Sequence, residues 1–363
     1  MKRLRPTWID VDLDAIRHNV RAVRPPGTEL MAVVKANAYG HGDVRVARAA
    51  LEAGATSLGV ALVEEGVRLR EAGIDAPILL LTEFAPGSEA EALAARLTPS
   101  LYSEDGLARL VAAGARTAHV KVDTGMHRAG LYPPEAAGAF VDRVAGAGLA
   151  IAGLWTHFAR AEDDDVTTKE QLLRFLDAAE EVRRRGHAPH RLHAANSAAA
   201  ILHPETHLDI VRSGLAMYGL EPAPGVGRDL GLRPALTWRS SVTLVKRLPA
   251  GERISYGHEY RLERPATIAT IPVGYADGYP RLLSSNADVL IRGRRCRVAG
   301  SVTMDHIMAD CDDLHVAPGD EVVVVGRQGS EEITVAELAR LSRTIPYEVI
   351  ARIGERVPRE FEA

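Results

Sequence analysis

Several residue types are scarce in this chain of 363 residues, and each shortage excludes a class of protein. Two cysteines, Cys296 and Cys311, are too few for a disulfide framework and too far apart for a metal knuckle. A formal net charge of −4 offers no basic field for nucleic acid or an anionic lipid surface. No window approaches the roughly 18 uncharged apolar residues of a membrane span, and no apolar signal segment follows the N-terminus. We therefore expect a cytoplasmic protein without nucleic-acid or membrane partners.

Lysine is also scarce, although basic residues as a whole are not. Of 44 basic residues only five are lysines: Lys2, Lys35, Lys121, Lys169 and Lys246. Nearly every surface cation is therefore an arginine, and a lysine at a special position needs a chemical reason. Arginine stays protonated at any working pH, whereas a partly desolvated lysine can lose its proton and attack a carbonyl to form an imine.

The first two thirds of the chain repeat one pattern, in which a short apolar run and a turn precede a stretch of helix formers such as Val44–Ala53 or Lys169–Arg185. Eight apolar runs predict strands: Leu30–Lys35, Thr56–Ala61, Pro77–Leu81, Thr98–Tyr102, Ala118–Val122, Ile151–His157, Arg191–Asn196 and His207–Arg212. Eight βα units predict an α/β fold, a (β/α)8 TIM barrel. An open doubly wound sheet is the alternative, but the Gly-x-Gly-x-x-Gly turn typical of it does not follow the first run.

The last third of the chain has strands without long helices. Its strand patterns are Leu236–Arg247, Thr267–Val273, Asp288–Val298 and Glu321–Gly326, and only Val335–Arg343 has a helical pattern. We expect an N-terminal barrel over residues 1–232 and a mainly β C-terminal domain over residues 233–363. For the first residues, about ten, packing with the β domain is an alternative to packing with the barrel.

Chemically useful side chains fall where the barrel strands are expected to end, which is where barrels place their active sites. The first, sixth, seventh and eighth runs end at Lys35, His157, Asn196 and Arg212, and Lys121 is the next-to-last residue of the fifth. Lys35 is therefore a candidate imine nucleophile. The last two loops, around Ser197 and Gly214, lie where barrels commonly bind phosphate. A phosphorylated aldehyde cofactor would satisfy both features.

Nine short motifs carry these and other polar residues in a fixed order along the chain. They are Val33–Gly42, Lys121–Arg128, Thr156–Phe158, Ala195–Ser197, Val211–Gly219, Ser255–Gly257, Gly274–Gly278, Met304–Asp305 and Tyr347–Glu348. Together they resemble the motifs of the alanine racemases, a family of fold-type III pyridoxal-phosphate enzymes. The resemblance covers essentially the whole chain, and the family's barrel and β domain agree with the strand count above.

The resemblance implies a role for each motif. Lys35 would bind pyridoxal 5'-phosphate as an imine and act as the base on one face of the substrate α-carbon, and Tyr256 would be the base on the other face. Further cofactor contacts would come from Tyr39, His157, Asn196, Ser197, Arg212, Gly214, Leu215 and Tyr347. Arg128 and the Met304 backbone would bind the substrate carboxylate. Lys121 would position Arg128, and in many family members this lysine is carbamylated.

The resemblance also implies a homodimer with composite sites, because in the family the tyrosine equivalent to Tyr256 comes from the partner subunit. His157 would lie between Arg212 and Tyr256. In the family an arginine faces the pyridine nitrogen; since arginine has no acidic proton to give, the ring nitrogen stays neutral and transamination is suppressed. Two positions depart from the family pattern: Ser301 stands where many members have arginine, and His127 occupies a position that is often a smaller residue.

The implied activity is the interconversion of L- and D-alanine by an isomerase that supplies D-alanine for peptidoglycan. The alternatives are a racemase of serine or of several amino acids, a non-catalytic pyridoxal-phosphate carrier and a basic-amino-acid decarboxylase. A carrier would not need Tyr256, and a decarboxylase would carry an acidic residue in place of Arg212. No metal site is expected, because Pro189 interrupts the regularly spaced histidines His187, His190 and His193.

Overall fold

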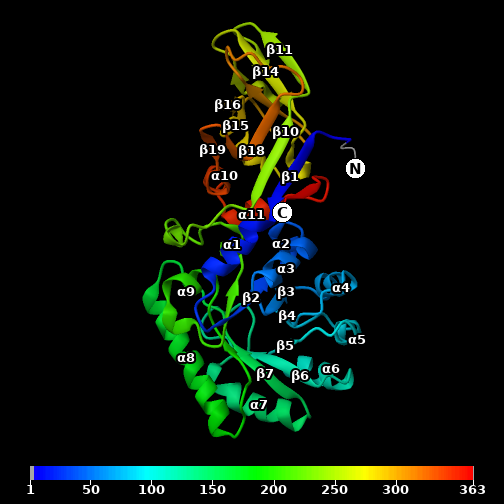
Figure 1. Cartoon of the computed structure of the whole chain (residues 1–363), viewed down its shortest axis with the longest axis vertical. Coiled ribbons are helices and arrows are strands. Elements are labelled where there is room, and N and C mark those ends of the chain that lie inside the picture. The colour runs from blue at the N-terminus through cyan, green and yellow to red at the C-terminus, as the bar shows by residue number, and fades with distance from the viewer. Residues whose placement is uncertain (1–3, 363) are drawn as a thin grey trace. The chain divides into compact units, whose positions relative to one another are not determined.

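The computed structural model describes residues 4–362, and the contacts within the chain divide it into two compact units (Figure 1). The larger unit comprises Asp14–Ala38 and Asp43–Arg233 and is described throughout. The other comprises the described parts of Met1–Leu13, Tyr39–Gly42 and Pro234–Ala363. Among the residues described, no helix is long and apolar enough to cross a membrane.

The larger unit is a barrel of parallel strands. They are β2 (Glu29–Val33), β3 (Ser57–Val60), β4 (Ile78–Leu80), β5 (Ser100–Leu101), β6 (Thr117–Lys121), β7 (Ala150–Trp155), β8 (Leu192–His193) and β9 (Ile210–Ser213). The strands pair in the orders β4-β3-β2-β9 and β5-β6-β7-β8. The two groups are joined where the Leu80 amide donates to the Thr98 carbonyl (2.9 Å) and the Arg212 amide to the Ala195 carbonyl (3.1 Å). The predicted (β/α)8 barrel, with its eight strands, is confirmed.

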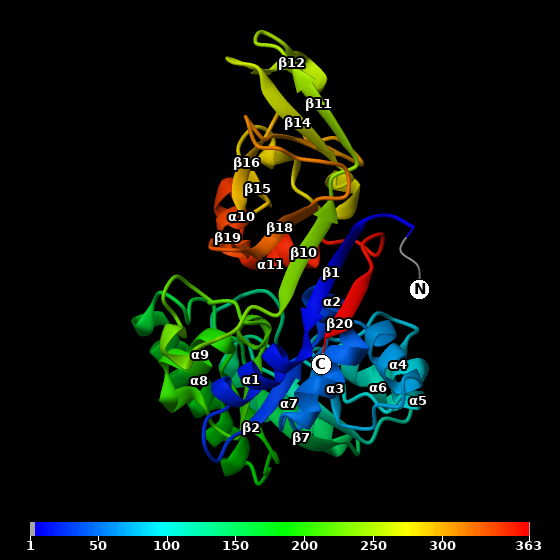
Figure 2. The same cartoon turned by 45° about the horizontal axis from the view of Figure 1, so that its top comes forward.

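Helices surround these strands (Figure 2). They are α1 (Leu13–Val23), α3 (Asp43–Glu52), α4 (Val63–Glu71), α5 (Glu89–Ala94), α6 (Glu104–Ala112), α7 (Ala137–Gly146), α8 (Asp165–Arg184) and α9 (Ser197–Leu202). Three of them begin at a polar residue whose side chain accepts a hydrogen bond from the first turn: Ser103, Asp164 and Asn196. Helix α8 buries Gln171, Phe175 and Ala178, a spacing of three to four residues that puts one face against the strands.

The inner face of the barrel is unusually polar. Barrel interiors are normally filled by branched apolar side chains, and here Met31, Leu79 and Ile210 form one such cluster. The same face also buries Lys121, His119, His193 and Arg212, which come from β6, β8 and β9. Since a charged side chain is almost never fully buried without a partner, this polar interior marks the part of the barrel where a site is expected.

The other unit is built on one mixed sheet of the order β11-β14-β17-β16-β15-β18-β10-β1-β20, with β19 paired to β18. The strands are β1 (Thr7–Asp12), β10 (Leu236–Ser241), β11 (Leu244–Leu248), β14 (Ala266–Ile271), β15 (Asp288–Ile291), β16 (Arg294–Val298), β17 (Ile307–Asp310), β18 (Glu321–Gln328), β19 (Glu331–Ile333) and β20 (Arg359–Glu362). A separate pair is formed by β12 (Arg253–Ile254) and β13 (Tyr260–Arg261). The expectation of a mainly β domain is confirmed.

Two details of this unit differ from the sequence expectation. The segments Leu236–Arg247 and Asp288–Val298, expected as single strands, are each divided in two: β10 and β11 are separated by residues 242–243 and are not neighbours in the sheet, whereas β15 and β16 form an antiparallel pair joined by a turn. Helix α10 (Val335–Leu341) was expected, but a further helix, α11 (Pro346–Ala351), was not. Its six residues include Tyr347, Val349 and Ile350, and so short an apolar segment does not distinguish a helix from a strand.

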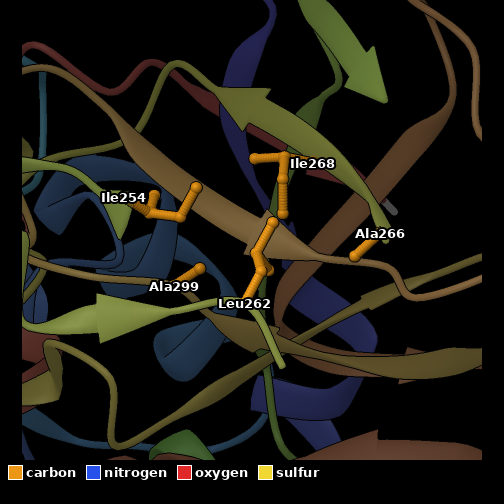
Figure 3. Packing of buried hydrophobic residues seen from close by; sticks show 5 residues of the cluster. All are labelled: Ile254, Leu262, Ala266, Ile268 and Ala299. Atoms are coloured by element: carbon orange, nitrogen blue, oxygen red, sulfur yellow. The ribbon is translucent and has the colours of Figure 1, made fainter. Parts of the chain in front are cut away.

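A small apolar core lies beside the pair β12–β13. Figure 3 shows its five residues, Ile254, Leu262, Ala266, Ile268 and Ala299, pointing toward one another. Leu248, Tyr260 and Met308 pack against this cluster. Ile254 precedes Tyr256 by two residues, so the cluster anchors the segment that carries Tyr256.

A buried ion pair connects the N-terminal segment to the loop after β14. The Asp277 side chain is fully buried, and its two oxygens each accept from an Arg5 guanidinium nitrogen at 2.5 Å. One of these oxygens also accepts from the Gly274 amide (2.9 Å). Because removing one partner of a buried pair leaves the other charge uncompensated, this contact is expected to be important for stability.

We predict that Asp277→Asn lowers the free energy of unfolding by about 2–3 kcal/mol, because it removes the charge that the Arg5 guanidinium pairs with. Urea denaturation followed by the fluorescence of the buried Trp238 in the same unit measures the change. The control is Asp313→Asn, whose exposed carboxylate lies 3.6 Å from Arg294; it should change stability by less than about 0.5 kcal/mol. Equal effects of the two substitutions would contradict the prediction.

Candidate active site

Four of the predicted site residues lie at one end of the barrel. Lys35 follows β2, Lys121 ends β6, His157 follows β7 and Arg212 lies in β9. The carboxyl ends of parallel barrel strands point to the same face. The positive charges there are close enough to act on one another: Arg128 lowers the pKa of Lys35, Lys121 and His157. The barrel therefore brings these five residues together at its mouth.

Lys35 has the properties of an amine that can react. Burial lowers the pKa of its ammonium, and the positive charge of Arg128 lowers it further, while Glu65 acts in the opposite direction. A lowered pKa increases the fraction of neutral amine, which is the form that attacks a carbonyl carbon. The remaining predicted surface lysines, Lys169 and Lys246, are exposed, and Lys2 lies outside the described residues.

The backbone after Lys35 makes an unusual left-handed turn. In α2 (Lys35–Tyr39) the residues Ala36, Asn37 and Ala38 have φ between 51° and 53°, and Tyr39 has φ 51°. This conformation costs roughly 1–2 kcal/mol per non-glycine residue. Two side chains hold it. A Glu65 carboxylate oxygen accepts from the Ala36 amide (2.6 Å), and the Asn37 side chain accepts from the Asp43 amide (3.0 Å).

Glu65 was missed by sequence reasoning, although it has a central place in this turn. Its second carboxylate oxygen accepts from the amides of Ala61 (2.8 Å) and Leu62 (3.1 Å), so the buried side chain joins the end of β3 to the turn after Lys35. A buried carboxylate with three backbone donors is well satisfied. The only sequence signal was an acidic residue in the first turn of a helix.

Arg212 is a buried guanidinium, with 3% of its surface exposed. Its Nη2 donates to the carbonyls of Thr156 (2.8 Å) and Ala194 (2.8 Å) and to His157 Nδ1 (3.2 Å), and its Nη1 donates to His193 Nδ1 (3.0 Å). Burial lowers its pKa to about 9. Nη2 has two hydrogens for its three acceptors, so one of them is shared between two acceptors. Within the described chain these hydrogen bonds leave the Nε–H and one Nη1–H to donate to another acceptor.

Lys121 is held among aromatic rings and cations. Its Nζ lies 4.4 Å from the centre of the Trp155 ring and 6.0 Å from that of Tyr102. Burial, together with the charges of Arg128 and Arg212, lowers its pKa to about 8. The aromatic contacts favour a cation, whereas the neighbouring arginines oppose it, and the net effect is an amine that is half neutral near pH 8.

The loops after β8 and β9 meet at Ser197. Its buried hydroxyl oxygen accepts from the amides of Gly214 (2.9 Å) and Ala216 (3.4 Å). Asn196, by contrast, uses its side-chain oxygen to cap α9 through the Ala199 amide (2.9 Å). Leu215 begins the short 3-10 turn Leu215–Tyr218. Because its oxygen accepts from two backbone amides, the Ser197 hydroxyl hydrogen is directed to another acceptor, such as an anion.

Four predicted site residues belong to the other unit. Tyr39 is buried, and its ring centre lies 5.9 Å from that of the half-buried Tyr347, which α11 carries. Tyr256 is 76% exposed and Met304 is 52% exposed. Tyr39 and Tyr347, both expected at the cofactor, are therefore neighbours. Tyr256, expected as the second base, is exposed on the surface of the unit that carries it.

The segment around Tyr256 is held in a strained conformation. Ser255 has φ 66° and His258 has φ 52°, values that side chains larger than glycine rarely adopt. Two serine hydroxyls secure it: the Ser255 hydroxyl donates to the Ser301 carbonyl (2.8 Å), and the Ser301 hydroxyl donates to the Tyr256 carbonyl (3.0 Å). Ser301, which departs from the family pattern, therefore fixes the tyrosine segment.

Gln171 was another residue that sequence reasoning missed. From α8 its side-chain nitrogen donates to the Thr124 hydroxyl (3.2 Å) and to the His157 carbonyl (3.3 Å), and its oxygen accepts from the Ala159 amide (2.9 Å). It therefore fixes the loop that carries His157. A buried glutamine on the inner face of a predicted helix was the available signal.

The residues at the barrel mouth fit pyridoxal phosphate. The group needs an amine that can be neutral, donors for a phosphate and a donor for a ring nitrogen. The structure offers Lys35 with a lowered pKa, the hydroxyl of Ser197 beside backbone amides, and the buried Arg212 with its Nε–H. The charge of the site also matches the charge of the cofactor, because the cations clustered at the mouth would be stabilised by an anionic phosphate.

Comparison with known proteins gives one result over the whole chain. The family model described as the N-terminal domain of alanine racemase matches residues 11–222, and the model of its C-terminal domain matches residues 235–361. A protein named alanine racemase from Symbiobacterium thermophilum is 52% identical over 99% of this chain and 97% of its own length. Its counterpart from Desulforamulus reducens is 44% identical over 98% of this chain and 99% of its own length.

Solved structures agree with these relatives. The alanine racemase of Streptomyces lavendulae matches with a TM-score of 0.94 and 42% identity, over 100% of this chain and 98% of the other. The alanine racemase of Bacillus anthracis, solved with bound L-Ala-P, matches with a TM-score of 0.93 and 37% identity, over 100% of this chain and 96% of the other.

We predict that Glu65→Gln weakens the turn after Lys35, because one of the three amides then faces an NH2 group instead of an acceptor. The expected loss is about 1–3 kcal/mol, measured by thermal unfolding, together with faster hydrogen exchange of the Ala36 amide. Glu64→Gln is the matched control, since Glu64 is the exposed neighbour on the same helix. Unchanged exchange at Ala36 in the Glu65 variant would contradict the assigned role.

Proposed function

This chain belongs to the alanine racemase family, and we propose that it is an isomerase that interconverts L-alanine and D-alanine with pyridoxal 5'-phosphate as cofactor. The observation that carries the proposal is the barrel mouth itself, where Lys35, an amine of lowered pKa, follows β2 and the buried Arg212 lies in the paired strand β9. In the cell this reaction would take place in the cytoplasm and supply D-alanine for peptidoglycan.

In this proposal Lys35 would hold the cofactor covalently. Tyr39, Tyr347, Ser197 and the backbone amides of Gly214 and Leu215 would bind its phosphate, the Gly214 amide being shared with the Ser197 hydroxyl oxygen to which it donates. Asn196 and His157 would also contact the cofactor. When bound, the cofactor withdraws electrons from the substrate α-carbon and so makes its proton acidic. Arg212 offers Nε–H to the ring nitrogen and gives up no proton, because a guanidinium stays protonated. The ring nitrogen therefore stays neutral, which disfavours transamination.

Racemisation requires a proton to leave one face of the α-carbon and another to return on the opposite face. Two groups are therefore needed, one on each side. We assign Lys35 Nζ to one face and the Tyr256 hydroxyl of the partner subunit to the other. The lowered pKa of Lys35 supports its role, since it increases the fraction of neutral amine, the form that can accept a proton. Tyr256 would lie near His157. The Nδ1 of His157 accepts from Arg212, so its Nε2–H is on the side of the ring away from Arg212.

The exposure of Tyr256 supports a homodimer with composite sites. A tyrosine that is 76% exposed on a strained, well-bonded segment has a defined position but no covering surface within its own unit. Residues 1–232 would then form the cofactor-binding barrel domain, except for the first residues, whose strand β1 pairs with β10, and residues 233–363 the domain that delivers Tyr256. The Met304 backbone and Arg128 would bind the substrate carboxylate.

Carbamylation of Lys121 would resolve the repulsion between two neighbouring cations. As an amine, Lys121 has a pKa lowered to about 8, in part because Arg128 and Arg212 repel its charge. The nitrogen of the neutral amine bonds to the carbon of carbon dioxide and a proton is released to solvent. An anionic carbamate thus takes the place of the ammonium cation, and the contact with Arg128 becomes attractive. The modified side chain would orient Arg128 for the substrate carboxylate.

We predict that purified protein with pyridoxal phosphate converts L-alanine to D-alanine in deuterated water and places deuterium on the α-carbon. Proton NMR detects the exchange, and chiral chromatography the product. Lys35→Ala should abolish both. A panel of L-amino acids that includes serine and lysine tests the side-chain specificity, for which we expect a preference for alanine. Absence of exchange at saturating cofactor would refute the proposed function.

Tyr256→Phe should keep the absorption band of the bound cofactor but lower kcat by about 10²–10⁴-fold, chiefly from L to D, since one of two bases is lost. Tyr260→Phe is the matched control: it removes a hydroxyl that donates to Asp310 (2.9 Å), outside the proposed site. The control should keep kcat within about twofold. Equal turnover in the Tyr256 variant and the wild type would overturn the two-base assignment.

Carbamylation of Lys121 should follow the neutral fraction of its amine. With a pKa of about 8 that fraction rises through pH 7–9, whereas an ordinary lysine would be below ~1% neutral at pH 8. Carbon-13 NMR with labelled bicarbonate should therefore show a carbamate signal that grows over this range. Lys121→Ala should lack the signal, and Lys169→Ala, an exposed control, should retain it. A signal that persists in Lys121→Ala would refute the assignment.

A further inference from the structure

The hydrogen bonds of Arg212 continue away from the mouth, into the barrel interior. Its Nη1 donates to His193 Nδ1 (3.0 Å), and the Nε2 of the same imidazole lies 3.0 Å from His119 Nδ1. Both histidines are buried. Branched apolar residues normally fill such positions, so two adjacent imidazoles there need a physical reason.

The chemistry of the partners fixes where every proton lies. A guanidinium only donates, so His193 Nδ1 must accept and its proton must be on Nε2. That Nε2–H then donates to His119 Nδ1, which places the His119 proton on its own Nε2. The geometry therefore requires one tautomer of each ring, and both rings must be neutral.

The same rule applies on the other side of Arg212. Its Nη2 donates to His157 Nδ1 (3.2 Å), so the His157 proton is on Nε2. One buried cation thus sets the tautomers of three histidines. Burial, supported by the charge of Arg212, lowers the pKa of His157 and His193 well below the usual value, and burial lowers that of His119 to about 4.

The packing around the two interior rings leaves them little freedom. The Trp155 ring stacks on His193 with centres 5.4 Å apart and an angle of 8°, and His119 meets His193 edge-on at 5.2 Å. Strand β7 lies between β6 and β8, and its Gly153 pairs with His119. A Cβ at Gly153 would overlap the His119 ring, so the missing side chain makes the contact across β7 possible.

The acceptor next to Arg212 is the neutral imidazole of His193 and not a carboxylate, and this difference affects the charge of the site. A carboxylate beside Arg212 would neutralise its charge, whereas an imidazole satisfies an N–H and leaves the charge in place. The charged groups that lower the pKa of His157 are Arg212, Arg128, Lys121 and Lys35, all basic, and one carboxylate, Asp123, acts on Lys121 in the opposite direction. The imidazole pair therefore fixes the orientation of the guanidinium without reducing the positive potential.

We propose that His193 and His119 form a positioning pair for Arg212, which fixes the rotation of its guanidinium and hence where Nε–H meets the cofactor and Nη2–H meets His157. The proposal rests on the proposed function for its effect on turnover. The tautomers that it requires are a property of the chain alone and do not depend on any bound group.

Nitrogen-15 NMR of the histidine rings in the cofactor-free protein tests the tautomers directly. We expect His119, His157 and His193 each to show an unprotonated Nδ1 and a protonated Nε2 from pH 6 to pH 8. Exposed His306 serves as the control. A proton on Nδ1 of His193, or a charged His193 at pH 7, would overturn the proposal even if the protein racemises alanine.

Substitutions test the effect on turnover. His193→Leu removes the acceptor and should lower kcat by about 10–100-fold, leave KM within about threefold and shift the absorption band of the bound cofactor. His193→Asn restores an acceptor at the Nδ1 position and should recover most of the loss. A kcat of the leucine variant equal to that of the wild type, or an unshifted band, would refute the positioning role.

Gly153→Ala tests the same pair if the leucine variant fails to fold. It should displace His119 and change the ring-nitrogen signals of His193 while Arg212 is left intact. Gly146→Ala is the control, because nothing lies within 4 Å of a Cβ at that position. Unchanged His193 signals in the Gly153 variant would contradict the coupling between the two rings.

Discussion

The buried guanidinium of Arg212 is the constraint on which the rest of the barrel site depends. A cation taken out of water must find acceptors for its N–H groups. Here the acceptors come from the ends of β7 and β8, as the carbonyls of Thr156 and Ala194 and the rings of His157 and His193. These contacts hold neighbouring strands and loops in one arrangement and leave Nε–H for a ligand.

A second consequence of Arg212 is the electrostatic character of the mouth. Lys35, Lys121 and Arg128 share this end of the barrel, and the mutual repulsion of their charges adds to burial in lowering the pKa of both lysines. Amines that are partly neutral can bond to carbon, and a cationic surrounding favours an anionic cofactor and a substrate carboxylate. The same field thus supports both the reactivity and the binding in the proposed function.

Backbone strain occurs beside both proposed bases. The residues after Lys35 form a left-handed turn, and Ser255 adopts a positive φ immediately before Tyr256. Side-chain hydrogen bonds maintain each conformation, from Glu65 in the first case and from Ser301 in the second. Strained backbone persists only where its surroundings determine it, and it is enriched at functional sites. The segment after Lys35 begins in the barrel unit and that of Ser255 belongs to the β unit, yet both contain strained backbone beside a proposed base.

The sequence by itself determined the eight strands of the barrel, the β character of the last third and the motifs that carry Lys35, Lys121 and Arg212, because these follow from local periodicity and from order along the chain. It did not determine α11, whose six residues are too few for a periodic pattern. Nor did it show the hydrogen bonds made by Glu65, Gln171 and Ser301, or the pairing of His119 with His193, since a hydrogen bond between residues 74 positions apart leaves no local pattern. Only the closing of the barrel, which brings β6, β8 and β9 together around Arg212, decided which buried polar side chains would meet.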